Sequence, residues 1–218
     1  MEITEFDFTQ ELRLILKQLT NEPSNRIQPK HGFVPPFIGG NDIKLIVIGQ
    51  DPTIRNVQQR KNIESTLNLN KPGALRRYIE QICDSLEITI ENVYATNVFK
   101  YFYERPPADT FDVLVKHLTP NLSLLKKELS VFPKVPVITL GEPVLKLLTD
   151  DIHAKVRYYW GYDSKTRTSN GAFKFLTANE NKLNRTFYPF CHQPSIRKQF
   201  YNDTLKEYAH FVKCMSRI

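Results

Sequence analysis

The chain has 218 residues, of which 41% are hydrophobic and 24% are charged, and these are ordinary values for a globular protein. At this length one hydrophobic core buries roughly 70% of the surface that the unfolded chain exposes. Small scaffolds that depend on disulfides or a structural metal are therefore excluded, and we expect a single domain over residues 1–218.

No stretch of the sequence approaches the ~18 consecutive apolar residues of a membrane-spanning helix. The first residues carry acidic side chains where a secretory signal peptide carries basic ones. The three cysteines are scattered, which suits reduced thiols and provides neither a Cys-x-x-Cys metal pair nor a four-cysteine cluster. We expect a monomer of the cytoplasm, or of the nucleus if the source is eukaryotic, that has no contact with a membrane.

The charge of the chain is clearly basic. Its 30 lysines and arginines against 23 aspartates and glutamates give a net charge of +7, and the pI is about 9.2. This balance favours polyanionic partners such as nucleic acids, although a solvated basic face has the same composition. The charge therefore makes nucleic acid a candidate partner, and only the sequence motifs can distinguish nucleic-acid binding from a solvated basic face.

Apolar residues recur at helical spacing in some segments and form continuous β-branched or aromatic runs in others. The helices are predicted at residues 6–19, 75–86, 114–129, 144–148 and 201–215. The strands are predicted at residues 44–48, 93–99, 135–140 and 187–191. The last strand is the weakest, because Pro189 cannot donate a hydrogen bond to a neighbouring strand. Since strands alternate with helices, the sequence predicts an α/β fold of three layers, α/β/α, around a central, mainly parallel four-stranded sheet.

Two segments lie outside this alternation. Residues 29–40 are rich in proline and glycine and lead into the first predicted strand. Residues 156–179 mix aromatic and basic side chains around Asn170 and Gly171. An Asn-Gly pair between aromatic residues favours a tight hairpin turn, so we expect a hairpin there.

Polar residues follow the carboxyl ends of the four predicted strands, where ligands bind in parallel sheets. They are Gln50 and Asp51 after the first strand, Asn97 near the end of the second, Gly141 and Glu142 after the third, and His192 to Ser195 after the fourth. A carboxylate, an amide and an imidazole at neighbouring strand ends can converge on one small planar ligand. Each also has a structural interpretation: Asp51 as a turn former, Asn97 as a partner of buried polar groups, and His192 as a loop residue.

Five segments carry a resemblance to a known family. They are VPPFIGG (residues 34–40), IVIGQDPT (46–53), ATNVF (95–99), VITLGEPVLKLL (137–148) and CHQPSIR (191–197). Their order resembles that of the uracil-DNA glycosylase superfamily, which has a Gly-Gln-Asp-Pro loop after the first strand, an Asn after the second, a third strand ending in Gly and a final His-Pro-Ser loop. The resemblance spans roughly residues 29–215.

The resemblance implies a DNA glycosylase that hydrolyses the N-glycosidic bond of uracil or a related damaged base, without cofactor or metal. This reaction develops positive charge on the deoxyribose and negative charge on the departing base. Asp51 would position water and stabilise the cationic sugar, and a neutral His192 would donate a hydrogen bond to uracil O2. The amide of Asn97 offers a donor and an acceptor that match O4 and N3 of uracil. Gln50 would contribute a backbone N–H.

The loop after His192 is implied in DNA binding. A base inside a duplex must flip out to reach such a pocket, and contacts with the backbone offset the energy this requires. Ile196 stands where the family has its apolar wedge, and Ser195, Arg197 and Lys198 would contact the DNA. Packing of Ile196 against the last helix is the alternative interpretation.

The sequence also departs from the family pattern. Thr53 stands where the best-known branch has a Tyr that rejects thymine, which leaves the exclusion of thymine open. Residues 54–72 contain no aromatic side chain, so Leu67 or Leu69 would replace the base-stacking Phe. Gln193 separates His192 from the Pro-Ser pair. These departures indicate a diverged member with an altered substrate range.

No lysine lies in the four strand-end motifs, so the sequence predicts a monofunctional glycosylase that leaves an abasic site. Two other classes stay open. One is a catalytically weak or inactive nucleic-acid-binding module with the same fold, which the missing Phe and Tyr favour. The other is an enzyme of nucleotides or phosphate esters, but the sequence has neither G-x-x-x-x-G-K-[ST] nor G-x-G-x-x-G. Retention of Asp51, Asn97 and His192 favours catalysis.

Overall fold

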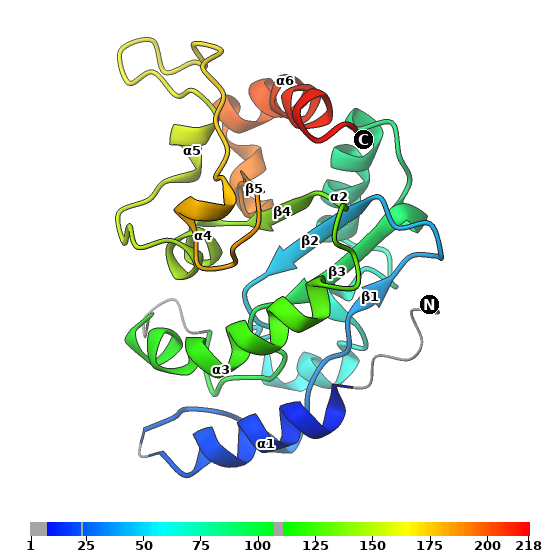
Figure 1. The fold of residues 1–218 in the computed structure, drawn as a ribbon, viewed down its shortest axis with the longest axis vertical. Coiled ribbons are helices and arrows are strands. Elements are labelled where there is room, and N and C mark those ends of the chain that lie inside the picture. The colour runs from blue at the N-terminus through cyan, green and yellow to red at the C-terminus, as the bar shows by residue number, and fades with distance from the viewer. Residues whose placement is uncertain (1–7, 23, 107–110) are drawn as a thin grey trace.

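The computed structural model describes residues 8–22, 24–106 and 111–218. At its centre is a five-stranded sheet in the order β1-β3-β2-β4-β5 (Figure 1). The strands are β1 (Phe37–Ile38), β2 (Leu45–Gly49), β3 (Val93–Asn97), β4 (Val137–Leu140) and β5 (Phe187–Phe190). The α-helices are α1 (Thr9–Thr20), α2 (Ala74–Ser85), α3 (Phe111–Leu129), α4 (Glu142–Leu148), α5 (Val156–Tyr159) and α6 (Gln199–Ser216).

Four of these strands are parallel, which confirms the mainly parallel α/β fold that the sequence predicts. β2 pairs with β3 on one side and with β4 on the other, and β4 pairs with β5. The prediction that the sheet has four strands was wrong, because β1 is a fifth strand and pairs with β3 in the antiparallel direction. β1 has only two residues, between two prolines and two glycines, and so short a strand shows no alternation in the sequence.

Helices cover both faces of the sheet, as the three-layer prediction requires (Figure 1). Every residue of β2, β3, β4 and β5 is buried, as expected of parallel strands with cover on both sides. α1 packs against α3, and α2 packs against α6. Tyr94 of β3 donates a hydrogen bond to Glu128 of α3 (2.6 Å), and Tyr78 of α2 donates one to the backbone carbonyl of Cys191 after β5 (3.1 Å).

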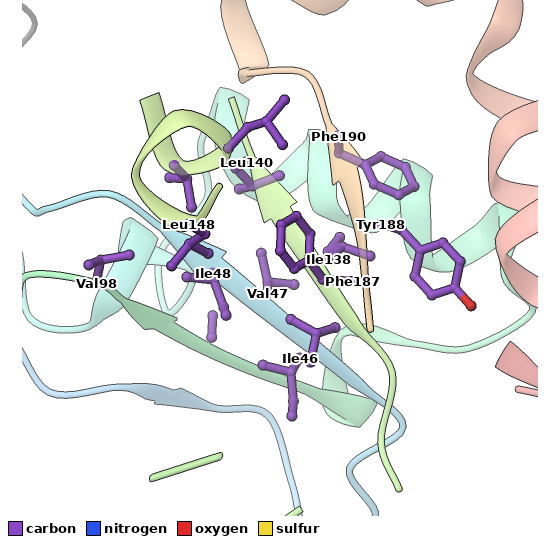
Figure 2. Packing of buried hydrophobic residues seen from close by; sticks show 14 of the residues in the cluster. Ile46, Val47, Ile48, Val98, Ile138, Leu140, Leu148, Phe187, Tyr188 and Phe190 are labelled. Carbon is purple, nitrogen blue, oxygen red and sulfur yellow. The ribbon is translucent and has the colours of Figure 1, made fainter. Parts of the chain in front are cut away.

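The centre of the core is built from side chains of β2, β4 and β5 (Figure 2). Ile46, Val47, Ile48, Ile138 and Phe187 are completely buried. Each fully buried side chain of this size contributes about 1.5–3 kcal/mol to stability. Because the strands are held this firmly, the loops that leave their carboxyl ends start from fixed positions.

Two local expectations need comment. The first helix was predicted to begin at residue 6, which lies outside the described residues, and α1 begins at Thr9. The hairpin with a tight turn at Asn170 was wrong. α5 is a short helix, and the antiparallel bridge after it joins Tyr162 to Ser169, which closes a loop of residues 163–168. The Asn170 Oδ1 accepts the N–H of Ala172, a local bond that competes with a hairpin turn.

Candidate active site

The polar residues that leave the strands lie around one cavity of about 440 Å³. Parallel pairing brings the strand ends together, since Gly49 at the end of β2 lies opposite Asn97 at the end of β3. The N–H of Gly141, after β4, donates to the carbonyl of Phe190 at the end of β5 (2.8 Å). The cavity is lined by Gly49, Gln50, Asp51, Pro52, Thr53, Ile54, Ile63, Leu67, Asn68, Leu75, Pro106, Leu140, Pro143 and His192.

Asp51 lies half-buried at the start of the loop after β2. Its Oδ1 accepts the backbone N–H of Thr53 and its Oδ2 accepts the side-chain amide of Gln50, both at 2.7 Å. Burial raises the pKa of the Asp51 carboxyl to about 6, although these hydrogen bonds and the charge of Arg60 act in the opposite direction. The carboxylate is therefore oriented by two donors and is ionised for the most part at neutral pH.

The loop that carries Asp51 is fastened to the segment after β3. The hydroxyl of Thr53 accepts the backbone N–H of Tyr103 (2.8 Å), while the same residue lines the cavity. The N–H of Phe99 donates to the carbonyl of Gln50 (2.9 Å). Thr53 and Gln50 thus join the cavity wall to the segment that follows β3.

Arg60 is a functional candidate that the sequence analysis missed. Its side chain is 1% exposed and donates to three carbonyls, those of Ile54 (3.0 Å), Tyr103 (2.7 Å) and Glu104 (3.0 Å). Among the described residues no carboxylate forms an ion pair with it. Its charge acts on Asp51, whose pKa it lowers. A buried arginine that binds carbonyls has no local sequence signature, so nothing in the sequence pointed to it.

Asn97 lies behind the cavity and does not line it. Its side chain is 1% exposed, and neither its Oδ1 nor its Nδ2 has a hydrogen-bond partner. A Cβ atom built on Gly49 would lie 2.3 Å from Asn97 Oδ1 and 2.8 Å from Leu67 Cδ2. Gly49 and Leu67 line the cavity, and the side chains of Asn97 and Leu67 both lie against Gly49. Buried amide groups without partners are rare in proteins, and in Asn97 both polar atoms of the amide lack one.

Leu67 has an unusual backbone conformation. Its φ is +58° and that of the next residue, Asn68, is +51°, both in the left-handed region that non-glycine residues seldom occupy. This strained turn lies beside the cavity. In proteins generally, strained backbone conformations are concentrated at active and binding sites. Aliphatic side chains of Ile54, Ile63, Leu67 and Leu75 provide the apolar wall, and no Phe, Tyr or Trp is among the described residues that line the cavity.

His192 also lines the cavity. It follows Cys191, the first residue after β5. Its side chain is exposed, and its Cβ would lie 3.2 Å from a Cβ built on Gly141, whose φ of +88° suits glycine. Desolvation by the surrounding protein lowers the pKa of the imidazole below its ordinary value. His192 is therefore neutral at pH 7 and can donate one ring N–H.

A family model of the uracil DNA glycosylase superfamily matches residues 36–217. The chain belongs to this superfamily. No curated protein matches the chain. Membership accounts for the mainly parallel sheet and supports a DNA glycosylase-like function that acts on DNA.

The loop after His192, where the superfamily resemblance implies DNA contacts, forms a short 3-10 turn, η8 (Gln193–Arg197). Arg197 and Lys198 are exposed, and Ser195 is partly exposed. Ile196 is partly buried and packs against the hydrophobic core. The packing of Ile196 is the alternative that the sequence left open, and its role as a wedge stays a prediction.

Within residues 8–22, 24–106 and 111–218, no group of three His, Cys, Asp or Glu side chains could hold a metal ion. In the same part of the chain, no helix has both the length and the apolar character needed to cross a bilayer.

Proposed function

We propose that this protein is a monofunctional DNA glycosylase that hydrolyses the N-glycosidic bond of uracil or a related damaged base. The observation that carries the proposal is the half-buried Asp51 carboxylate, which two donors orient at the wall of a cavity of about 440 Å³. Pockets for small ligands measure roughly 300–1,000 Å³, so a base fits this one. Membership of the superfamily supports DNA as the substrate.

Asp51 acts on the sugar side of the bond. As the bond to the base breaks, positive charge develops on the deoxyribose, and a carboxylate in a partly dry site stabilises it. Asp51 also directs a water molecule to C1′ of the sugar. The oxygen of this water forms the new bond to C1′, and the electron pair of the broken bond leaves with the base. The water gives up one proton, which neutralises the negative charge of the departing base.

His192 and Asn97 act on the base. His192 is neutral because desolvation lowers its pKa, and its ring N–H stabilises the negative charge that develops at O2 of uracil. The unpartnered amide of Asn97, which lies against Gly49 of the cavity lining, pairs with O4 and N3 of the base. Cytosine has the opposite donor and acceptor at these positions and leaves buried polar groups unpaired.

The monofunctional mechanism is supported by the absence of an amine nucleophile. No lysine is among the described residues that line the cavity. Lys100, close to the end of β3, is buried and its Nζ already binds Thr96 (2.5 Å), the carbonyl of Asn97 (3.2 Å) and Glu128 (2.6 Å). Without an amine to attack the sugar, water is the nucleophile and the DNA strand stays intact.

The test is base release from oligonucleotides that each carry one modified base, read out by alkaline cleavage of the abasic product. We expect release from uracil or a related base. Asp51→Asn should lower the rate by ~10² or more while DNA binding persists. Asp84→Asn, on the exposed surface of α2, is the matched control and should keep the parent rate.

Two results would overturn the proposal. Borohydride trapping of a covalent protein–DNA adduct would reveal an amine nucleophile. Failure to release any base, with DNA binding intact, would identify the chain as a binding module that retains the fold.

A further inference from the structure

A second hollow, of about 860 Å³, lies next to the candidate active site. One wall is the arm, by which we mean residues 155–169, and the other is the beginning of α6. The hollow adjoins the catalytic cavity at two points. Glu142 lines the hollow while its neighbour Pro143 lines the cavity. Lys198, at the end of the loop that begins with His192, lines the hollow as well.

The hollow is lined by both cations and carboxylates, and three of its cations have no carboxylate partner among the described residues. Arg157 and Arg167 of the arm are exposed, as is Lys198, and no carboxylate among the described residues forms an ion pair with any of the three. Lys155 is paired with Glu142 (3.2 Å). The other carboxylates of the hollow, Asp203 and Glu207, belong to α6. The arm therefore presents unpaired cations.

The arm is held in a fixed conformation. The N–H of Asp163 donates to the carbonyl of Thr168 (2.9 Å), the N–H of Arg167 donates to that of Asp163 (2.8 Å), and the hydroxyl of Ser169 donates to that of Trp160 (2.9 Å). The guanidinium carbon of Arg157 lies 4.8 Å from the centre of the Tyr162 ring, a cation–π contact that orients it. Cations on a rigid loop lose little conformational freedom when they bind an anion.

Arg167 occupies the left-handed backbone region with a φ of +62°. Glycine or asparagine adopts this conformation more easily, so the position is costly for a long side chain.

We propose that the hollow holds the DNA strand on one side of the target nucleotide, with Arg157, Arg167 and Lys198 on its phosphates. This inference rests on the proposed function, because the target base is taken to occupy the adjoining cavity. A strand whose base passes between His192 and Asp51 continues past Glu142 and Lys198 into the hollow. Amino groups of its bases are donors, and Asp203 and Glu207 on the other wall are acceptors for them.

The probe for this surface is duplex DNA with a tetrahydrofuran abasic-site analogue, bound by the full chain and followed by fluorescence anisotropy over a salt series. Three duplexes are compared: one with long flanks on both sides of the analogue, and two in which one flank or the other is cut short. The variant is Arg157→Ala with Arg167→Ala. The control is Arg13→Ala with Lys134→Ala, which removes the same charge from exposed positions in α1 and before β4.

We expect the arm variant to bind the long duplex at least tenfold more weakly at low salt. Its log–log salt slope should fall by about 2, at ~0.9 for each phosphate no longer neutralised. The loss of affinity in the arm variant should disappear with one of the two shortened duplexes. It should persist with the other. Arg157→Lys with Arg167→Lys should keep the slope, because the charge is retained. The control variant should change affinity less than twofold.

An equal loss on both shortened duplexes, or a loss no greater than that of the control, would overturn the proposal. Base release by the unaltered protein is measured in parallel. If it is absent while the flank-specific loss remains, the proposed function fails and the DNA surface stands. If release occurs without a flank-specific loss, the DNA surface alone fails.

Discussion

Arg60 is the buried cation behind Asp51, and its three hydrogen bonds go to backbone carbonyls while its charge acts on the carboxylate. The residue therefore has two separable effects. The hydrogen bonds hold residues 54–60 against the segment after β3, and the charge opposes the rise in the pKa of Asp51 that burial causes. Because a hydrogen bond and a charge respond differently to substitution, the two effects can be measured separately.

Arg60→Gln should lower the free energy of unfolding by about 2–4 kcal/mol, since buried carbonyls lose their donors. It should also raise the pKa of Asp51. On the proposed mechanism, base release by the unaltered protein requires the ionised carboxylate, so the single-turnover rate should fall as the pH drops through about 6. In Arg60→Gln the midpoint should move to higher pH.

Arg60→Lys separates the two effects of Arg60, because it keeps the charge and loses donors. It should destabilise the protein and leave the pH midpoint near that of the parent. Arg77→Gln, at an exposed position of α2, controls for the loss of net charge. An unchanged midpoint in Arg60→Gln would contradict the electrostatic link to Asp51.

Asp51→Asn should stabilise the fold while it slows base release. The pKa of Asp51 is raised in the folded state from 3.8 to about 6. The folded state therefore binds the proton more tightly, and stability falls as the pH rises from about 4 to 6. Above pH 6 the charged carboxylate lowers the free energy of unfolding by up to about 3 kcal/mol, at ~1.36 kcal/mol for each unit by which the pKa is raised. Denaturation at pH 7.5 and at pH 4 measures this: the stabilisation should be present at the higher pH and small at the lower one.

Gly49→Ala should disturb the floor of the cavity. The added methyl group would overlap the amide of Asn97 and crowd Leu67, and overpacking of this kind costs about 1–3 kcal/mol. Combining it with Asn97→Ala should recover much of the stability, because the amide is no longer in the way. The double variant should still fail to discriminate bases. A double-mutant cycle in chemical denaturation measures the coupling, and purely additive effects would contradict the contact.

Asn97→Asp should change base preference more than it changes DNA affinity. The carboxylate lacks the amide donor for O4 of uracil and provides an acceptor for the amino group of cytosine. Competition between uracil and cytosine oligonucleotides measures the shift. Asn121→Asp is a control on another buried amide, one whose Nδ2 already binds Tyr101 (3.1 Å) and the carbonyl of His117 (2.8 Å). If Asn97→Asp keeps the parent rate and preference, the amide has only a structural role.

The sequence predicted the four parallel strands because each is a continuous apolar run, and it predicted the strand-end residues because parallel strands deliver them to one edge. Asp51 and His192 do line one cavity. The absence of Asn97 from the cavity lining could not be predicted, and neither could the left-handed turn at Leu67 and Asn68, because neither residue is a glycine. β1 was missed because it is too short. Arg60 was missed because two of its three carbonyl partners lie 43 and 44 residues away in the sequence, and only that of Ile54 is near.

The proline in β5 has a consequence for association between molecules. β5 is the last strand of the sheet, and an outermost strand with free N–H and C=O groups can recruit a strand of another chain. On the outward side of β5, Phe187 exchanges both its backbone groups with Leu176 (3.0 Å each). Pro189 has no N–H to offer, and its carbonyl accepts the indole N–H of Trp160 (2.8 Å). The sheet therefore ends at β5 with its outward groups already used, and this border offers no template for aggregation.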